Sequence, residues 1–185
     1  MKERLQHQHT LKSSYDQFEK FLLSKGILLS RDTEVGHWGV THLPAVFELL
    51  EKLDIQKKHS FVDLGSGDGR VALAAGLYCD NSQGIEFDDW LLGSANTIKG
   101  KHPHLNYVEF HKKDFMNHNL EEYDFIYHSP DQPYYRGRLN QKLLNELKGK
   151  LIVHGWEFHP KGLTLEEEHI INGEMFRVYK NPNLF

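Results

Sequence analysis

The chain contains 185 residues, of which 22 are basic and 26 acidic, so its net charge is −4. This length fits a single domain with one hydrophobic core, and the acidic balance argues against a protein built mainly on contacts to nucleic-acid phosphates. Cys79 is the single cysteine and cannot form an internal disulfide. Because we also recognise no membrane-spanning apolar run and no signal segment, we expect a cytoplasmic protein without a membrane anchor.

The first 58 residues (1–58) are predicted to form helices and a cap beside the core. Apolar residues recur there at helical spacing, which predicts a helix that packs on the core edge or, alternatively, a lid over the active site. A loop is expected at Ser30–His42, where Trp38 either fills the core or forms the wall of a pocket. Thr41 is predicted to cap a second helix, which the chain enters at Pro44.

From residue 59 onward, strand and helix patterns alternate. This alternation is typical of a doubly wound, Rossmann-like α/β sheet, and we expect five parallel strands followed by an antiparallel hairpin, within one domain spanning 1–185. Asn172-Gly173-Glu174 is the hairpin signal. The predicted strands are residues 61–63, 82–86, 107–111, 123–128, 150–154, 169–172 and 175–179, with helices at 70–78, 90–99 and 139–147 between them.

The most informative segment follows the first core strand. Asp63 ends that strand, and three alternating glycines begin at Gly65, where the backbone can turn tightly and approach a ligand closely. The next helix offers free N–H groups to the ligand, and we expect Asp68 to cap this helix and Arg70 to point outward. A nicotinamide oxidoreductase needs a third glycine where Arg70 stands, and the carboxylate of Asp63 suits a cationic ligand better than a pyrophosphate.

The run D-L-G-S-G-D-G from Asp63 to Gly69 fills every position of D/E-x-G-x-G-x-G. It thereby resembles the first motif of class I (seven-β-strand) S-adenosylmethionine-dependent methyltransferases, which implies that fold and S-adenosylmethionine as cofactor. Within this superfamily the motif, the acid in G-I-E-F at Glu86 and the upstream W-G-V-T-H-L-P from Trp38 look most like small lysine methyltransferases related to the ATP synthase c-subunit lysine methyltransferase.

The resemblance also implies where the cofactor binds. Glu86, after the second core strand, should accept hydrogen bonds from both ribose hydroxyls. Asp114, after the third, should accept from the adenine amino group with Phe115 against the ring, while Phe87 either covers the other ring face or lies in the core. The predicted cofactor-binding residues are Trp38, Asp63, Gly65, Ser66, Gly67, Gly69, Glu86, Phe87, Asp114 and Phe115.

The segment after the fourth core strand should border the transferable methyl group, and its predicted catalytic residues are His128, Ser129, Asp131 and Tyr134. His128 either takes a proton from the acceptor or hydrogen-bonds a loop. Ser129 begins S-P-D-Q-P-Y, which departs from the [D/N/S]-P-P-[F/Y] turn of base and amide methyltransferases and so disfavours base methylation. Asp131 could attract a cationic acceptor, and Tyr134 could line its channel.

These patterns favour an S-adenosylmethionine-dependent methyltransferase that acts on a protein lysine. The D-x-x-Y pattern of some lysine methyltransferases matches Asp124–Tyr127, and His154 and Trp156 are further candidates after the fifth strand. A methyltransferase for a small molecule or RNA is the alternative, as is a non-catalytic binding module that keeps the pocket. The 13 histidines lack the spacing of metal ligands, so no metal site is predicted.

Overall fold

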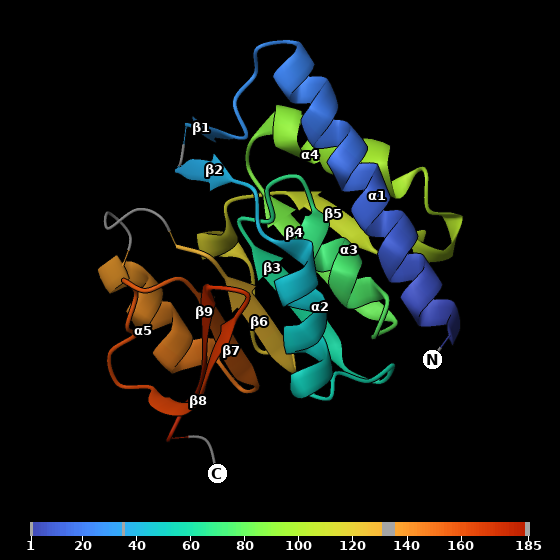
Figure 1. Cartoon of the computed structure of the whole chain (residues 1–185). Coiled ribbons are helices and arrows are strands. Elements are labelled where there is room, and N and C mark those ends of the chain that lie inside the picture. The colour runs from blue at the N-terminus through green and yellow to red at the C-terminus, as the bar shows by residue number, and fades with distance from the viewer. Residues whose placement is uncertain (1, 35, 131–135, 184–185) are drawn as a thin grey trace.

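The computed structural model describes residues 2–34, 36–130 and 136–183 of the chain. In these residues seven strands form one mixed sheet, two more form a small hairpin, and helices cover both sheet faces (Figure 1). The helices are α1 (Lys2–Ser24), α2 (Leu43–Lys52), α3 (Arg70–Gly76), α4 (Asp89–Lys99) and α5 (Arg136–Glu146), with 3₁₀ turns η1 (Pro103–Leu105) and η2 (Phe115–Asn117). The hairpin strands are β1 (Ser30–Asp32) and β2 (His37–Gly39), and the sheet strands are β3 (Ser60–Leu64), β4 (Asn81–Glu86), β5 (Glu109–Lys112), β6 (Phe125–His128), β7 (Lys150–His154), β8 (Thr164–Ile171) and β9 (Glu174–Lys180).

The sheet has the strand order β5-β4-β3-β6-β7-β9-β8. Strands β3 to β7 are parallel, whereas β9 is antiparallel to both β7 and β8, which confirms the predicted Rossmann-like arrangement. Leu64 pairs with both Ile85 and His128, so β3, β4 and β6 end level with one another. The strand order reverses between β3 and β6, and open α/β sheets bind ligands at the carboxyl ends of the strands beside such a point.

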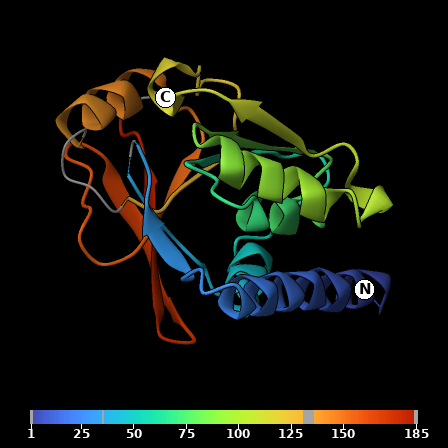
Figure 2. The same cartoon turned by 90° about the horizontal axis from the view of Figure 1, so that it is seen from above.

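Two apolar clusters, one on each face, hold the helices to the sheet. Successive residues of β3 point to opposite faces, so Phe61 joins the cluster under α1 to α4 while Val62 joins the cluster under α5. Figure 2 shows α1 and α2 on one side of the strands and α5 on the other. In the described part of the chain, no helix combines the length and apolar character needed to span a membrane.

The structure corrects two expectations about the N-terminal region. Ser30–His42 was expected to be a loop, but it contains the β1–β2 hairpin, whose three-residue strands are too short to show an alternating pattern. Thr41 is not the cap of α2, because His42 occupies the N-cap position and makes no side-chain capping bond. That residues 1–185 form a single domain stays a prediction.

Candidate active site

The loop between β3 and α3 turns on three glycines with positive φ, 75° at Gly65, 55° at Gly67 and 79° at Gly69. A Cβ on Gly67 would come within 2.7 Å of the Trp38 indole, so this tryptophan packs directly on the loop backbone. Trp38 is buried in a small apolar cluster and also lines the cavity above the loop, so both of its predicted roles apply. Gly69 lies outside the described lining, and a Cβ there would meet Phe110 at 2.6 Å.

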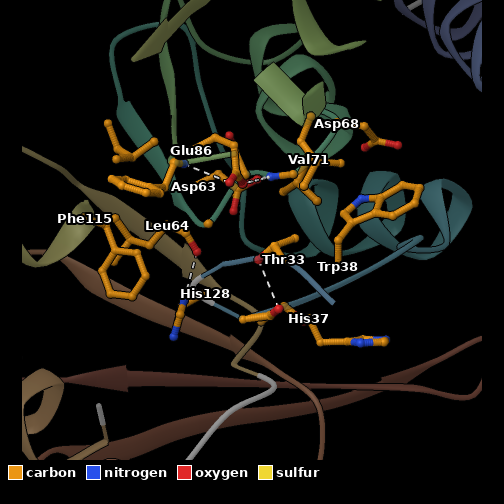
Figure 3. A pocket seen from close by; sticks show the side chains of 18 of the residues that line it. Thr33, His37, Trp38, Asp63, Leu64, Asp68, Val71, Glu86, Phe115 and His128 are labelled. Carbon is orange, nitrogen blue, oxygen red and sulfur yellow. Dashed lines mark hydrogen bonds between the residues drawn. The ribbon is translucent and has the colours of Figure 1, made fainter. Parts of the chain in front are cut away.

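A cavity of about 820 Å³ lies at the carboxyl ends of β3, β4, β6 and β7. The glycine-rich loop forms its floor, and the β1–β2 hairpin contributes to its wall. Figure 3 shows Asp63 and Glu86 side by side, with Trp38 to one side and Phe115 and His128 to the other. Of the predicted site residues, the cavity brings together Trp38, Asp63, Gly65, Ser66, Gly67, Glu86, Phe87, Asp114, Phe115, His128 and Ser129.

The carboxylate of Asp63 lines this cavity. Asp63 is 4% exposed, and within the described residues no hydrogen bond to its carboxyl group is found. Burial raises the pKa of the Asp63 carboxyl well above its usual range, and the neighbouring carboxylates of Glu86 and Asp68 raise it further. A buried carboxylate next to other carboxylates is stabilised by a cationic ligand. Ser66, whose buried hydroxyl also lacks a partner in the described part of the chain, adds a second polar group beside it.

The carboxylate of Glu86 accepts three hydrogen bonds from the backbone, which its position at the end of a strand did not predict. One carboxylate oxygen accepts from the N–H of Gly67 at 2.7 Å, and the other accepts from the N–H groups of Phe87 and Asp88, each at 2.8 Å. Burial raises the pKa of Glu86, while these backbone bonds act in the opposite direction. Each carboxylate oxygen has two lone pairs, so the two bonds from Phe87 and Asp88 use both lone pairs of Oε1, and Oε2 keeps one for a ligand. This leaves room for one ribose hydroxyl and not for the two that the sequence analysis expected.

Arg70 does not point outward as the sequence analysis expected. It is 4% exposed, and its guanidinium pairs with Asp68 at 2.7 Å and with Glu19 of α1 at 2.9 Å. Asp68 is therefore an ion-pair partner more than a helix cap, since its bond to the Arg70 N–H is 3.4 Å long and Gly69 is the N-cap residue. Tyr15 of α1 also donates to the Asp68 carbonyl at 2.9 Å. These contacts join α1 to the glycine-rich loop.

The residues predicted to surround the adenine lie along the ends of β4 and β5. Asp114 accepts from the N–H of Met116 at 2.8 Å and so caps η2, which places its carboxylate in the cavity lining. Phe115 also lines the cavity, with its ring edge-on to His128 at 5.2 Å. Phe87 is 38% exposed and lines the cavity, so it does not lie in the core.

On the other side of the cavity lie the residues predicted to meet the acceptor. His128 is buried, and its Nδ1 donates to the Leu64 carbonyl at 2.9 Å, so Nε2 carries the lone pair of the neutral ring. Ser129 is exposed and lies 3.3 Å from Nδ1 of His154. Asp131 and Tyr134 fall outside the described residues.

Two features of the site escaped the sequence analysis. The first is the hairpin wall, which Arg31 fastens to α4 by pairing with Asp88 and packing over the Trp90 ring at 4.6 Å. The second is Glu174, whose carboxylate lies 2.8 Å from Nε2 of His154. Tryptophan in a glycine-flanked segment was the only sequence signal for the first, and the second had none.

The family described as "Histone methylation protein DOT1" matches residues 33–132, which is more than half of the chain. The chain belongs to the DOT1 family. As a member it is an S-adenosylmethionine-dependent methyltransferase, and the matched residues include β2, the glycine-rich loop and the ends of β4, β5 and β6. No curated protein matches the sequence.

Solved structures share the fold of this DOT1-family chain at low sequence identity. An RNA methyltransferase from Salinibacter ruber in complex with S-adenosyl-L-homocysteine is 22% identical, with a TM-score of 0.67 over 79% of this chain and 95% of that one. A mutant of MtNAS in complex with S-adenosylmethionine is 13% identical, with a TM-score of 0.60 over 76% and 63%. A conserved hypothetical protein of Streptococcus pyogenes is 12% identical, with a TM-score of 0.59 over 75% and 96%.

Proposed function

We propose that this protein transfers a methyl group from S-adenosylmethionine to the side-chain amine of a protein lysine. The observation that carries the proposal is the surplus of negative charge in the cavity, which favours a cationic acceptor over a nucleic-acid phosphate. Among the described lining residues six are carboxylates and three are Lys or Arg. The carboxylates are Asp32, Glu34, Asp63, Asp68, Glu86 and Asp114, and the cations are Arg70, Lys113 and Arg138.

Three further points support a lysine acceptor. The family description names histone methylation, and histones are lysine-rich proteins. The segment from Ser129 departs from the turn used by base and amide methyltransferases. The resemblance to lysine methyltransferases related to the ATP synthase c-subunit enzyme points to the same acceptor.

The cavity residues fit S-adenosylmethionine in both charge and shape. When bound, the cofactor supplies a methyl group on a positively charged sulfur, which is activated for displacement. The carboxylate of Asp63 would hold its cationic methionine end, and the loop at Gly65 and Gly67 would let it approach the backbone closely because no Cβ intervenes. Glu86 would hold the ribose, and the adenine would bind beside Asp114, Phe87 and Phe115, with Trp38 as the wall against the loop.

On the acceptor side the chain must align an amine and exclude water. The rings of Phe115 and Phe158 lie 5.2 and 6.3 Å from the His128 ring and hold it in place. His128 is proposed to contact the acceptor through Nε2, with Ser129 next to it. The proposed roles of Asp131 in attracting the acceptor and of Tyr134 in lining its channel remain predictions.

The direct test incubates the protein with methyl-labelled S-adenosylmethionine and two acceptors, core histones and extract from cells that lack the gene. Label recovered as methyllysine, located by mass spectrometry, is the expected result. Label in RNA or in a small molecule would contradict the lysine acceptor. Calorimetric binding of S-adenosylmethionine without transfer to any acceptor would indicate a binding module instead.

A further inference from the structure

We propose that Ser129, His154 and Glu174 form a proton relay that removes a proton from the acceptor amine. This inference rests on the proposed lysine acceptor, since a lysine side chain is an ammonium at neutral pH and has no lone pair for the incoming methyl group. The three residues come from different strands: Ser129 follows β6, His154 ends β7, and Glu174 begins β9. Ser129 and His154 both line the cavity that contains the glycine-rich loop.

The register of the sheet brings these residues together. His128 pairs with Val153, so Ser129 and His154 are the next residues at the carboxyl ends of two adjacent parallel strands. The Ser129 Oγ lies 3.3 Å from Nδ1 of His154, within hydrogen-bond reach, and catalytic hydrogen bonds are often long without substrate. The ring of His154 is stacked on Phe176 at 4.7 Å with an interplanar angle of 19°, which fixes its plane.

The hydrogen bonds determine which nitrogen of His154 can accept a proton. Nε2 lies 2.8 Å from a carboxylate oxygen of Glu174, and a carboxylate accepts only, so Nε2 carries the hydrogen. Nδ1 of the neutral ring therefore has a lone pair directed at Ser129. Glu174 would also stabilise the imidazolium once Nδ1 is protonated. In His128, by contrast, the described partner of Nδ1 is the neutral carbonyl of Leu64.

The proton transfer balances without any further reactant. The ammonium N–H bond breaks and leaves its electron pair on nitrogen, while the Ser129 oxygen takes that proton. The Ser129 hydroxyl proton passes at the same time to Nδ1 of His154, which forms an imidazolium paired with Glu174. The amine is then neutral, and the imidazolium returns its proton to solvent after turnover. Ser129 thus contacts the acceptor, His154 stores the proton and Glu174 positions His154.

The experiment compares the wild type with H154Q, S129A and E174Q on core histones from pH 7 to pH 10. H154Q should lower kcat about 10²-fold at pH 7, the low end for general-base catalysis, with unchanged S-adenosylmethionine affinity. Its activity should approach that of the wild type as the pH nears the lysine pKa of about 10.4, because the amine then loses its proton in solution. S129A and E174Q should show smaller losses with the same recovery.

His169 supplies the matched control. It forms a similar pair with Glu167 at 3.0 Å. His169 of β8 and His154 of β7 both pair with Phe176 of β9, but His169 is not in the described cavity lining. H169Q should keep the wild-type pH profile. An H154Q defect that is constant across pH, or a recovery seen in H128Q but not in H154Q, would overturn the relay.

A measurement without turnover separates this inference from the proposed function. In ¹⁵N NMR of the cofactor-free protein, neutral His154 should be the Nε2–H tautomer, and E174Q should weaken this preference. The Nδ1–H tautomer would refute the relay whatever the acceptor is. Absence of methyllysine with the wild type would instead refute the lysine acceptor and, with it, the relay's role, even with the tautomer as expected.

Discussion

The carboxylate of Glu86 accepts from the backbone N–H of Gly67 at 2.7 Å, so the end of β4 holds the centre of the glycine-rich loop in place. Glu86 is therefore part of the fold as well as a proposed ribose ligand. Ligand binding at Glu86 and ligand binding at the loop should therefore be coupled, because both depend on this hydrogen bond.

The first prediction concerns the removal of that bond. Glu86→Ala leaves three backbone N–H groups without their carboxylate and should lower the free energy of unfolding by about 3 kcal/mol. Binding of S-adenosylmethionine should weaken by about 2–3 kcal/mol as well. Denaturant unfolding and calorimetry measure the two effects. An unfolding free energy equal to that of the wild type would show that the bond contributes nothing to the fold.

The second prediction concerns the loop backbone. Gly67→Ala should destabilise the protein by at least about 1–2 kcal/mol, because alanine disfavours a φ of 55° and its Cβ would strike Trp38. Gly93→Ala is the control, since this position in α4 has nothing within 4 Å of an added Cβ, and alanine there should stabilise by about 0.5–1 kcal/mol. Equal effects of the two substitutions in denaturant unfolding would contradict the structure.

The third prediction follows from the raised pKa of Asp63. The folded protein binds a proton at Asp63 more tightly than the unfolded chain does, so this group lowers stability as the pH rises above about 4, the ordinary carboxyl value. In the cofactor-free protein, Asp63→Asn should therefore be more stable than the wild type at pH 8 and lose this advantage toward pH 4.

The same substitution should act in the opposite direction on the cofactor. Without the carboxylate, affinity for S-adenosylmethionine should fall about 10- to 100-fold, which corresponds to one charged hydrogen bond. Unfolding from pH 4 to pH 8 with and without S-adenosylmethionine tests both effects. A variant that is destabilised at every pH would show that Asp63 supports the fold and is not reserved for a cationic ligand.

The fourth prediction concerns the buried ion pair beside the loop. Arg70→Met leaves the carboxylate of Asp68, which is 1% exposed, without its partner and should cost about 3–5 kcal/mol. The double variant Asp68→Asn/Arg70→Met should recover part of this loss. A double-mutant cycle in denaturant unfolding gives the coupling, and strictly additive losses would argue against it.

The sequence predicted those parts of the site whose residues are close together in the chain. Asp63 and its glycines form one continuous segment, and Glu86 follows a recognisable buried strand, so pattern alone predicted their neighbourhood. The orientation of Arg70 could not be predicted, because Glu19, its partner on α1, is 51 residues away in the sequence. The same holds for His154 and Glu174, which meet only through the antiparallel pairing of β7 with β9.

The helix α1 leaves the ribosome before every element that it contacts. Its buried residues Leu11 and Tyr15 pack with α2 and α3, and the Tyr15 hydroxyl binds the carbonyl of Asp68, 53 residues further along. During synthesis the apolar face of α1 therefore stays exposed to solvent until that later segment has been made. The glycine-rich loop in turn receives its contacts from α1 only when this earlier-made helix docks on it.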